Sequence, residues 1–101
     1  MPKLYEYFGI VFYFYANEHL PIHVHAKFEK YETIFELIYE NGELAEVKQR
    51  FFVGSGPPLP TKKRKEAETF VRAYYKEITE KWQMFFILKT EILAERITQK
   101  L

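Results

Sequence analysis

Residues 54–60, Gly-Ser-Gly-Pro-Pro-Leu-Pro, divide this 101-residue chain into two halves of different character. The half before this linker is rich in aromatic and β-branched residues, whereas residues 61–101 contain neither Gly nor Pro. The first composition favours strands and the second favours helix. Because the two kinds of segment follow one another without alternating, the sequence predicts an α+β fold. Its length predicts a single domain over residues 1–101, with a strand half at about 5–53 and a helical half at 61–101.

The strand half contains four segments that turn signals separate. Residues 8–15 form a continuous apolar and aromatic run, which is typical of a strand buried on both faces. Residues 23–29 and 31–39 alternate in polarity, as half-buried strands do. Asn-Gly at residues 41–42 predicts a tight hairpin turn, since both central positions of that turn need positive φ. A fourth strand is then expected over residues 43–53, which makes an antiparallel meander of about four strands.

The helical half carries apolar residues at helical spacing. Thr61 can cap a helix that begins there, and a single helix over all of residues 61–101 would be unusually long for so small a domain. We therefore expect a break near residues 75–77 and two helices that cover the sheet, with residues 95–101 either fraying or adding an edge strand. The apolar positions are Ala67, Phe70, Val71 and Tyr74 before the break, then Ile78, Trp82, Phe85 and Phe86 in the second helix.

Composition excludes several classes of function. The chain has 15 basic and 14 acidic residues, and this balance argues against a protein that acts mainly as a polycation on nucleic acid or lipid. The absence of cysteine excludes disulfides, thiolate nucleophiles and cysteine-based zinc sites. The absence of Asp excludes a Ser–His–Asp triad. No apolar run approaches the roughly 18–20 residues of a membrane span, so we expect a soluble, cytoplasmic protein without a membrane partner.

All three histidines lie in one segment, His-Leu-Pro-Ile-His-Val-His at residues 19–25. His23 and His25 are two residues apart, so on a strand their side chains project from the same face. His19 precedes the strand, and a bend at Pro21 would bring it towards the other two. If the following turn centres on residues 29–30, antiparallel pairing places Glu36 opposite His23. This segment is the best candidate for a functional site.

Three interpretations of the histidines remain open. His19, His23 and His25 could bind a divalent transition metal, because neutral imidazoles at this spacing suit such an ion. Alternatively, His23 and His25 could donate and accept protons, with Glu36 orienting them. The third interpretation is structural, since histidines on a polar sheet face are often only solvated or hydrogen-bonded.

Basic residues offer two candidate phosphate contacts. Lys27 shares the histidine strand and pairs opposite Glu32, while Arg50 lies on the expected fourth strand. A second set, Lys62, Lys63 and Arg64, occupies the first turn of the expected helix, where the helix dipole disfavours positive charge. These side chains could contact phosphate, or they could simply form a solvated helix face.

Several motifs resemble small bacterial proteins of domain-of-unknown-function family 4160. They are Phe-Gly-Ile at residues 8–10, Glu-His at 18–19, Pro-Ile-His-Val-His-Ala at 21–26 and Glu-Ile-Thr-Glu-Lys-Trp at 77–82. The resemblance covers residues 3–40 closely and 61–85 loosely. Where the family's common form is Pro-Pro-His-Phe-His, this chain has Pro-Ile-His-Val-His at residues 21–25. The family has no established activity, but its members are often encoded beside another small protein, similar to toxin–antitoxin modules.

These observations give one leading hypothesis and two alternatives. The leading hypothesis is a component of a toxin–antitoxin-like two-gene module that acts on a phosphodiester of nucleic acid through the histidines. The first alternative is a non-catalytic module that binds a partner protein, encoded by a neighbouring gene, or a second copy of itself. The second alternative is metal binding through the His-x-His pair.

Overall fold

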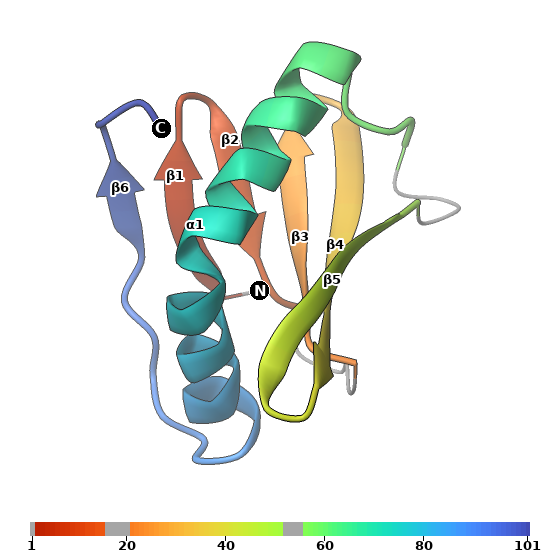
Figure 1. Ribbon diagram of the computed structural model, residues 1–101. Coiled ribbons are helices and arrows are strands. Elements are labelled where there is room, and N and C mark those ends of the chain that lie inside the picture. Colours follow the sequence, from red (N-terminus) through yellow and green to blue (C-terminus); the bar gives the residue numbers. More distant parts are fainter. Residues whose placement is uncertain (1, 16–20, 52–55) are drawn as a thin grey trace.

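The computed structural model describes residues 2–15, 21–51 and 56–101. In these residues one helix packs across one face of a six-stranded sheet, as Figure 1 shows. The strand order is β5-β4-β3-β2-β1-β6, and all neighbours are antiparallel except the parallel pair β1 and β6. The elements are β1 (Lys3–Tyr7), β2 (Ile10–Tyr13), β3 (His23–Phe28), β4 (Tyr31–Glu40), β5 (Glu43–Arg50), α1 (Thr61–Phe86) and β6 (Glu95–Ile97).

The predicted α+β class is confirmed, but the predicted antiparallel sheet of about four strands is wrong, because the sheet has six strands and β6 pairs parallel with β1. A turn at Phe8 and Gly9 interrupts the apolar run over residues 8–15, and both residues have positive φ, 46° and 86°. Two such residues suit the tight turn of a hairpin. The chain therefore forms β1 and β2 as a hairpin, and β1 lies wholly before residues 8–15, the segment in which the first strand was expected.

The second and third hairpins agree with the prediction. Asn41 and Gly42 have φ of 53° and 81° in the turn between β4 and β5. Between β3 and β4, His23 pairs with Glu36 and Lys27 pairs with Glu32, which confirms the predicted register. A bulge in β5 interrupts its pairing with the end of β4, and β5 ends at Arg50.

The prediction of two helices is wrong. α1 continues through the expected break for 26 residues, about 39 Å at 1.5 Å per residue. No Gly or Pro interrupts it, and one apolar stripe along it packs on the sheet from end to end, so nothing favours a break. The N-cap is Pro60, not Thr61, and it forms no side-chain capping bond. The buried residues of the stripe are Ala67, Phe70, Val71, Ile78 and Trp82.

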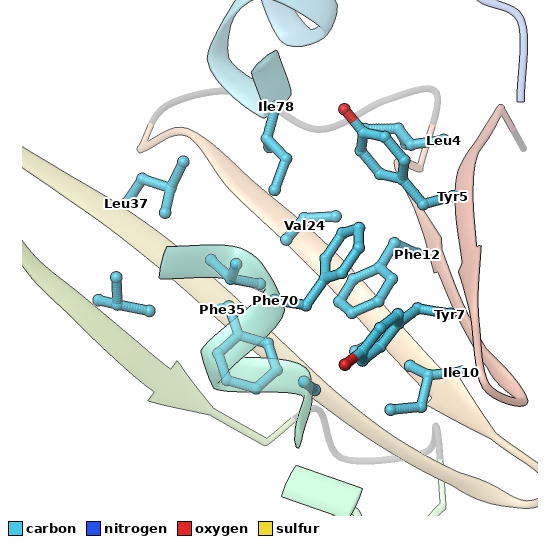
Figure 2. Close-up of a cluster of buried hydrophobic side chains, with 14 of the residues drawn as sticks. Leu4, Tyr5, Tyr7, Ile10, Phe12, Val24, Phe35, Leu37, Phe70 and Ile78 are labelled. Carbon is cyan, nitrogen blue, oxygen red and sulfur yellow. The ribbon is translucent and has the colours of Figure 1, made fainter. Parts of the chain in front are cut away.

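The core lies between α1 and the sheet (Figure 2). Phe70 is at its centre, with its ring stacked on Phe12 at a centroid distance of 4.6 Å. The rings of Tyr5 and Tyr7 lie 5.1 and 4.9 Å from the same ring. Aromatic contacts of this kind add stability beyond the burial of apolar area. The dense aromatic residues of the first half are therefore largely core.

The chain after α1 runs back to the sheet edge and forms β6 beside β1, which is one of the two outcomes expected for residues 95–101. Residues 87–94 between them form neither helix nor strand. Among the described residues, no helix is both long enough and apolar enough to cross a membrane.

Candidate functional site

His23 and His25 lie on the sheet face opposite α1. Val24 and Ala26 of β3 belong to the core beneath α1, and strand alternation turns His23 and His25 to the other side. Their ring centroids are 5.5 Å apart. We call this side of the sheet the histidine face; its polar residues are Tyr13, His23, His25, Lys27, Glu32, Glu36, Lys48 and Arg50.

The central polar side chains of this face are buried. His25 is 1% exposed and His23 is 5% exposed, although α1 covers the other face. Glu32 and Glu36 are 4% and 8% exposed. Burying polar groups is costly unless they are hydrogen-bonded. Their bonding partners therefore decide what the face can do.

Glu32 joins three strands of the histidine face. One of its carboxylate oxygens accepts a hydrogen bond from the Tyr13 hydroxyl, and the other lies 3.1 Å from Nδ1 of His25. Because a carboxylate oxygen accepts, Nδ1 is the nitrogen that carries the proton. The Tyr13 ring stacks on the His25 ring with their centroids 5.3 Å apart, and the Tyr15 ring contacts the His25 ring edge-on with their centroids 4.2 Å apart.

The same contacts keep the Tyr13 phenol neutral. Burial raises the pKa of Tyr13 well above its usual value, and the hydrogen bond to Glu32 raises it further. The phenol thus stays a hydrogen-bond donor throughout the neutral range. Tyr13, His25 and Glu32 together tie β2, β3 and β4 to one another.

His23 and Glu36 are paired in register but have other described partners. Nδ1 of His23 lies 2.7 Å from the carbonyl oxygen of Pro21, which only accepts, so this nitrogen carries the proton. The Nε of Arg50 donates to Glu36 at 2.8 Å. Among the described residues, the carboxylate that forms a hydrogen bond with a histidine is thus that of Glu32. From the sequence, Glu32 was expected only as the residue opposite Lys27, and Glu36 was expected to orient the histidines.

A signal for Glu32 existed in the sequence. His25 pairs directly with Ile34, and Glu32 lies two residues from Ile34 on the same strand face. This diagonal position is within reach of a long side chain. Tyr13 could not be found in this way, because its position opposite His25 depends on the pairing of β2 with β3.

Among the described residues, no third ligand joins His23 and His25 to form a metal site. In residues 2–15, 21–51 and 56–101 no group of three or more His or Glu side chains is arranged to hold a metal ion. His19, the expected third ligand, lies outside the described residues.

The candidate phosphate contacts divide between the two sides of the sheet. Lys27 and Arg50 lie on the histidine face, but the helix residues do not. Lys63 lies 4.7 Å from the ring centroid of Phe28 and donates to the carbonyl oxygen of Phe8, which places it on the α1 side. Arg64 lines a groove of about 460 Å³ between α1 and β5, and Lys62 is exposed in the same turn.

Comparison with known proteins identifies one family. The model of a domain of unknown function (DUF4160) matches residues 9–83. The match spans the histidine face and most of α1, and it ends before β6. Neither a curated protein nor a solved structure matches the chain.

Proposed function

The chain belongs to the family of the domain of unknown function DUF4160, and from this premise we propose that it is a non-catalytic module that binds a partner protein. The partner would be the product of a neighbouring gene, as in a toxin–antitoxin-like pair. In this proposal the histidine face holds the sheet together, and an exposed edge strand binds the partner.

The burial of the histidines carries the proposal. A general acid or base must come within about 2.6–3.2 Å of the proton it transfers. His23 and His25 are at most 5% exposed, and their Nδ1 atoms are directed at groups of the chain itself. A substrate on the surface of the sheet does not reach side chains placed in this way. Their contacts instead suit a structural role.

The edge strand β5 is the surface that we assign to the partner. In the described part of the chain β5 pairs only with β4, so its other side offers backbone donors and acceptors. Its exposed side chains change sign along the strand, from Glu43 and Glu46 to Lys48. A partner strand with a basic residue opposite Glu46 and an acidic one opposite Lys48 would match this order, because opposite charges across strands stabilise a register.

The binding experiment uses the purified partner and the full chain. The double charge reversal Glu46→Lys with Lys48→Glu should weaken the complex at least tenfold, measured by titration calorimetry. Lys27→Glu is the matched control, because Lys27 is also an exposed strand lysine but lies on β3, away from the edge. A complex that tolerates the reversal at β5 would rule out this surface, and no complex at all would rule out the proposal.

Action on a phosphodiester is the second candidate, and one observation favours it. Lys27, Lys48 and Arg50 lie on the same sheet face as the buried His23 and His25, and their charges could hold a phosphate backbone. This candidate predicts that the purified chain binds or cleaves a single-stranded RNA oligonucleotide. It is excluded if His23→Ala and His25→Ala, tested as folded proteins, leave both properties unchanged.

A further inference from the structure

The connection between α1 and β6 contains three of the seven large hydrophobic residues that are exposed in the described part of the chain. Ile87, Leu88 and Leu93 are 62%, 67% and 78% exposed, and all three lie in residues 87–94. Scattered apolar residues on a surface are ordinary, but large side chains gathered in one connection mark a binding surface.

The same connection contains a strained residue. Lys89 has φ of 57°, in the left-handed region that a lysine seldom adopts. It follows the last bonds of α1, in which the N–H groups of Ile87 and Leu88 both donate to the carbonyl oxygen of Gln83. Residues 87–94 contain neither Gly nor Pro. The N–H of Thr90 donates to the carbonyl oxygen of Met84 at 2.7 Å, so an extended path through this segment would relieve the strain at Lys89 but would break this hydrogen bond.

The segment beyond the connection is held by its pairing with β1, by ion pairs, and by apolar contacts: Ile97 packs on the core, and Lys100 lies over the ring of Tyr7. β6 pairs with β1 over three residues, and Arg96 and Glu95 form ion pairs with Glu6 and Lys81 at 3.1 and 3.0 Å. The pair of Arg96 with Glu6 is exposed, and an exposed ion pair adds little stability. Neither ion pair nor the pairing with β1 involves residues 87–94. The segment can thus make these contacts equally well with another copy of the chain.

We propose that residues 95–101 exchange between two copies of this chain, so that β6 of each copy pairs with β1 of the other. The eight residues of the connection span roughly 26–29 Å when extended, which is long enough to cross to a neighbouring molecule. The two connections would run alongside each other and bury Ile87, Leu88 and Leu93 against their counterparts. Exchange of an identical element between two copies is a low-cost route to a dimer, and strain in the hinge favours it. The exchange involves neither β5 nor the partner protein, so either proposal can fail while the other stands.

The absence of cysteine allows a direct test. Glu6 and Arg96 are paired in register across β1 and β6, and the spacing of paired strands is compatible with a disulfide. Glu6→Cys and Arg96→Cys are made as separate full-length variants, unfolded together at high concentration, refolded and oxidised. Exchange predicts a dimer, by light scattering after size exclusion, in which a disulfide joins the two variants at least tenfold more often than in the control. The control replaces Arg96→Cys with Lys27→Cys, which puts an exposed cysteine on a strand that does not pair with β1.

Two further variants separate exchange from other dimers. Glu6→Cys and Arg96→Cys in one chain, oxidised as a dilute monomer, should abolish the dimer, because β6 is then fixed to its own β1. Lys89→Gly should lower the dimer fraction severalfold, because glycine relieves the strain of the closed connection. A chain that stays monomeric after refolding at every concentration overturns the proposal. So does a dimer that survives the intramolecular disulfide.

Discussion

Removal of one hydroxyl group tests the role of the buried network on the histidine face. In Tyr13→Phe the ring that stacks on His25 remains, but Glu32 loses the donor to one of its two carboxylate oxygens. The other oxygen keeps its contact with His25. The variant therefore removes the hydroxyl, with its hydrogen bond to Glu32 and its contact with Tyr15, and leaves the packing of the ring in place.

The expected cost follows from the charge and burial of the acceptor. A hydrogen bond to a charged group contributes about 1.5–3 kcal/mol, more than a neutral pair. Tyr13 and Glu32 are each 4% exposed, so water does not readily replace the lost donor. We expect Tyr13→Phe to lower the free energy of unfolding by about 1.5–3 kcal/mol. In a domain of this size that corresponds to a fall in Tm of at least about 6 °C.

Urea unfolding at neutral pH measures this difference, with Tyr31→Phe as the matched control. Tyr31 is a half-buried tyrosine of β4 whose hydroxyl forms no hydrogen bond with the described residues, so its loss should cost less than about 0.5 kcal/mol. Combining Tyr13→Phe with Glu32→Gln should give a coupling energy of about 0.5–3 kcal/mol. If the two Phe variants have the same stability, the network does not hold the sheet in the way that we infer.

Three other predictions concern the core and the turns. Burial, helped by a neighbouring glutamate, raises the pKa of both Tyr5 and Tyr13 above the ordinary value of 10.0. Above about pH 10 only the unfolded chain ionises these phenols, so the free energy of unfolding is constant below that pH as far as these two groups decide it. Above it, the free energy of unfolding falls by up to about 1.4 kcal/mol per pH unit for each tyrosine. Unfolding measured against pH should show a shallower fall in Tyr13→Phe than in the unchanged chain. Gly56→Ala should lower the free energy of unfolding by roughly 1–3 kcal/mol more than Gly42→Ala. A Cβ at residue 56 would lie 2.4 Å from a backbone carbonyl oxygen of the β3–β4 turn, whereas a Cβ at residue 42 has nothing within 4 Å. Chemical unfolding of both variants measures the difference. Phe70→Ala should lower stability by about 3–5 kcal/mol in the same assay, and a loss below 1 kcal/mol would contradict its central place in the core.

Local patterns were sufficient for the features that depend on neighbours in the chain. Alternation placed His23 and His25 on one face, and the Asn-Gly turn and the turn at residues 29–30 set the register in which His23 pairs with Glu36. The change in composition at the linker predicted strands followed by helix. Each of these features follows from the period of a strand or the φ preferences of a turn.

Other features depend on contacts between distant segments, and here the sequence alone was insufficient. A continuous apolar run cannot show where a chain reverses, so the turn at Phe8 and Gly9 was missed. The unbroken length of α1 is set by the sheet that it covers. The pairing of β1 with β6 joins residues about 90 positions apart.

The histidine face shows the same division most clearly. The sequence by itself determined which residues share this face, because side-chain direction alternates along each strand. Only the tertiary structure decided that Tyr13 and Glu32 contact His25, that Glu36 contacts Arg50, and that the basic first turn of α1 lies on the other side of the sheet. The physical reason is that alternation specifies a face, whereas the neighbours across that face depend on how the strands assemble.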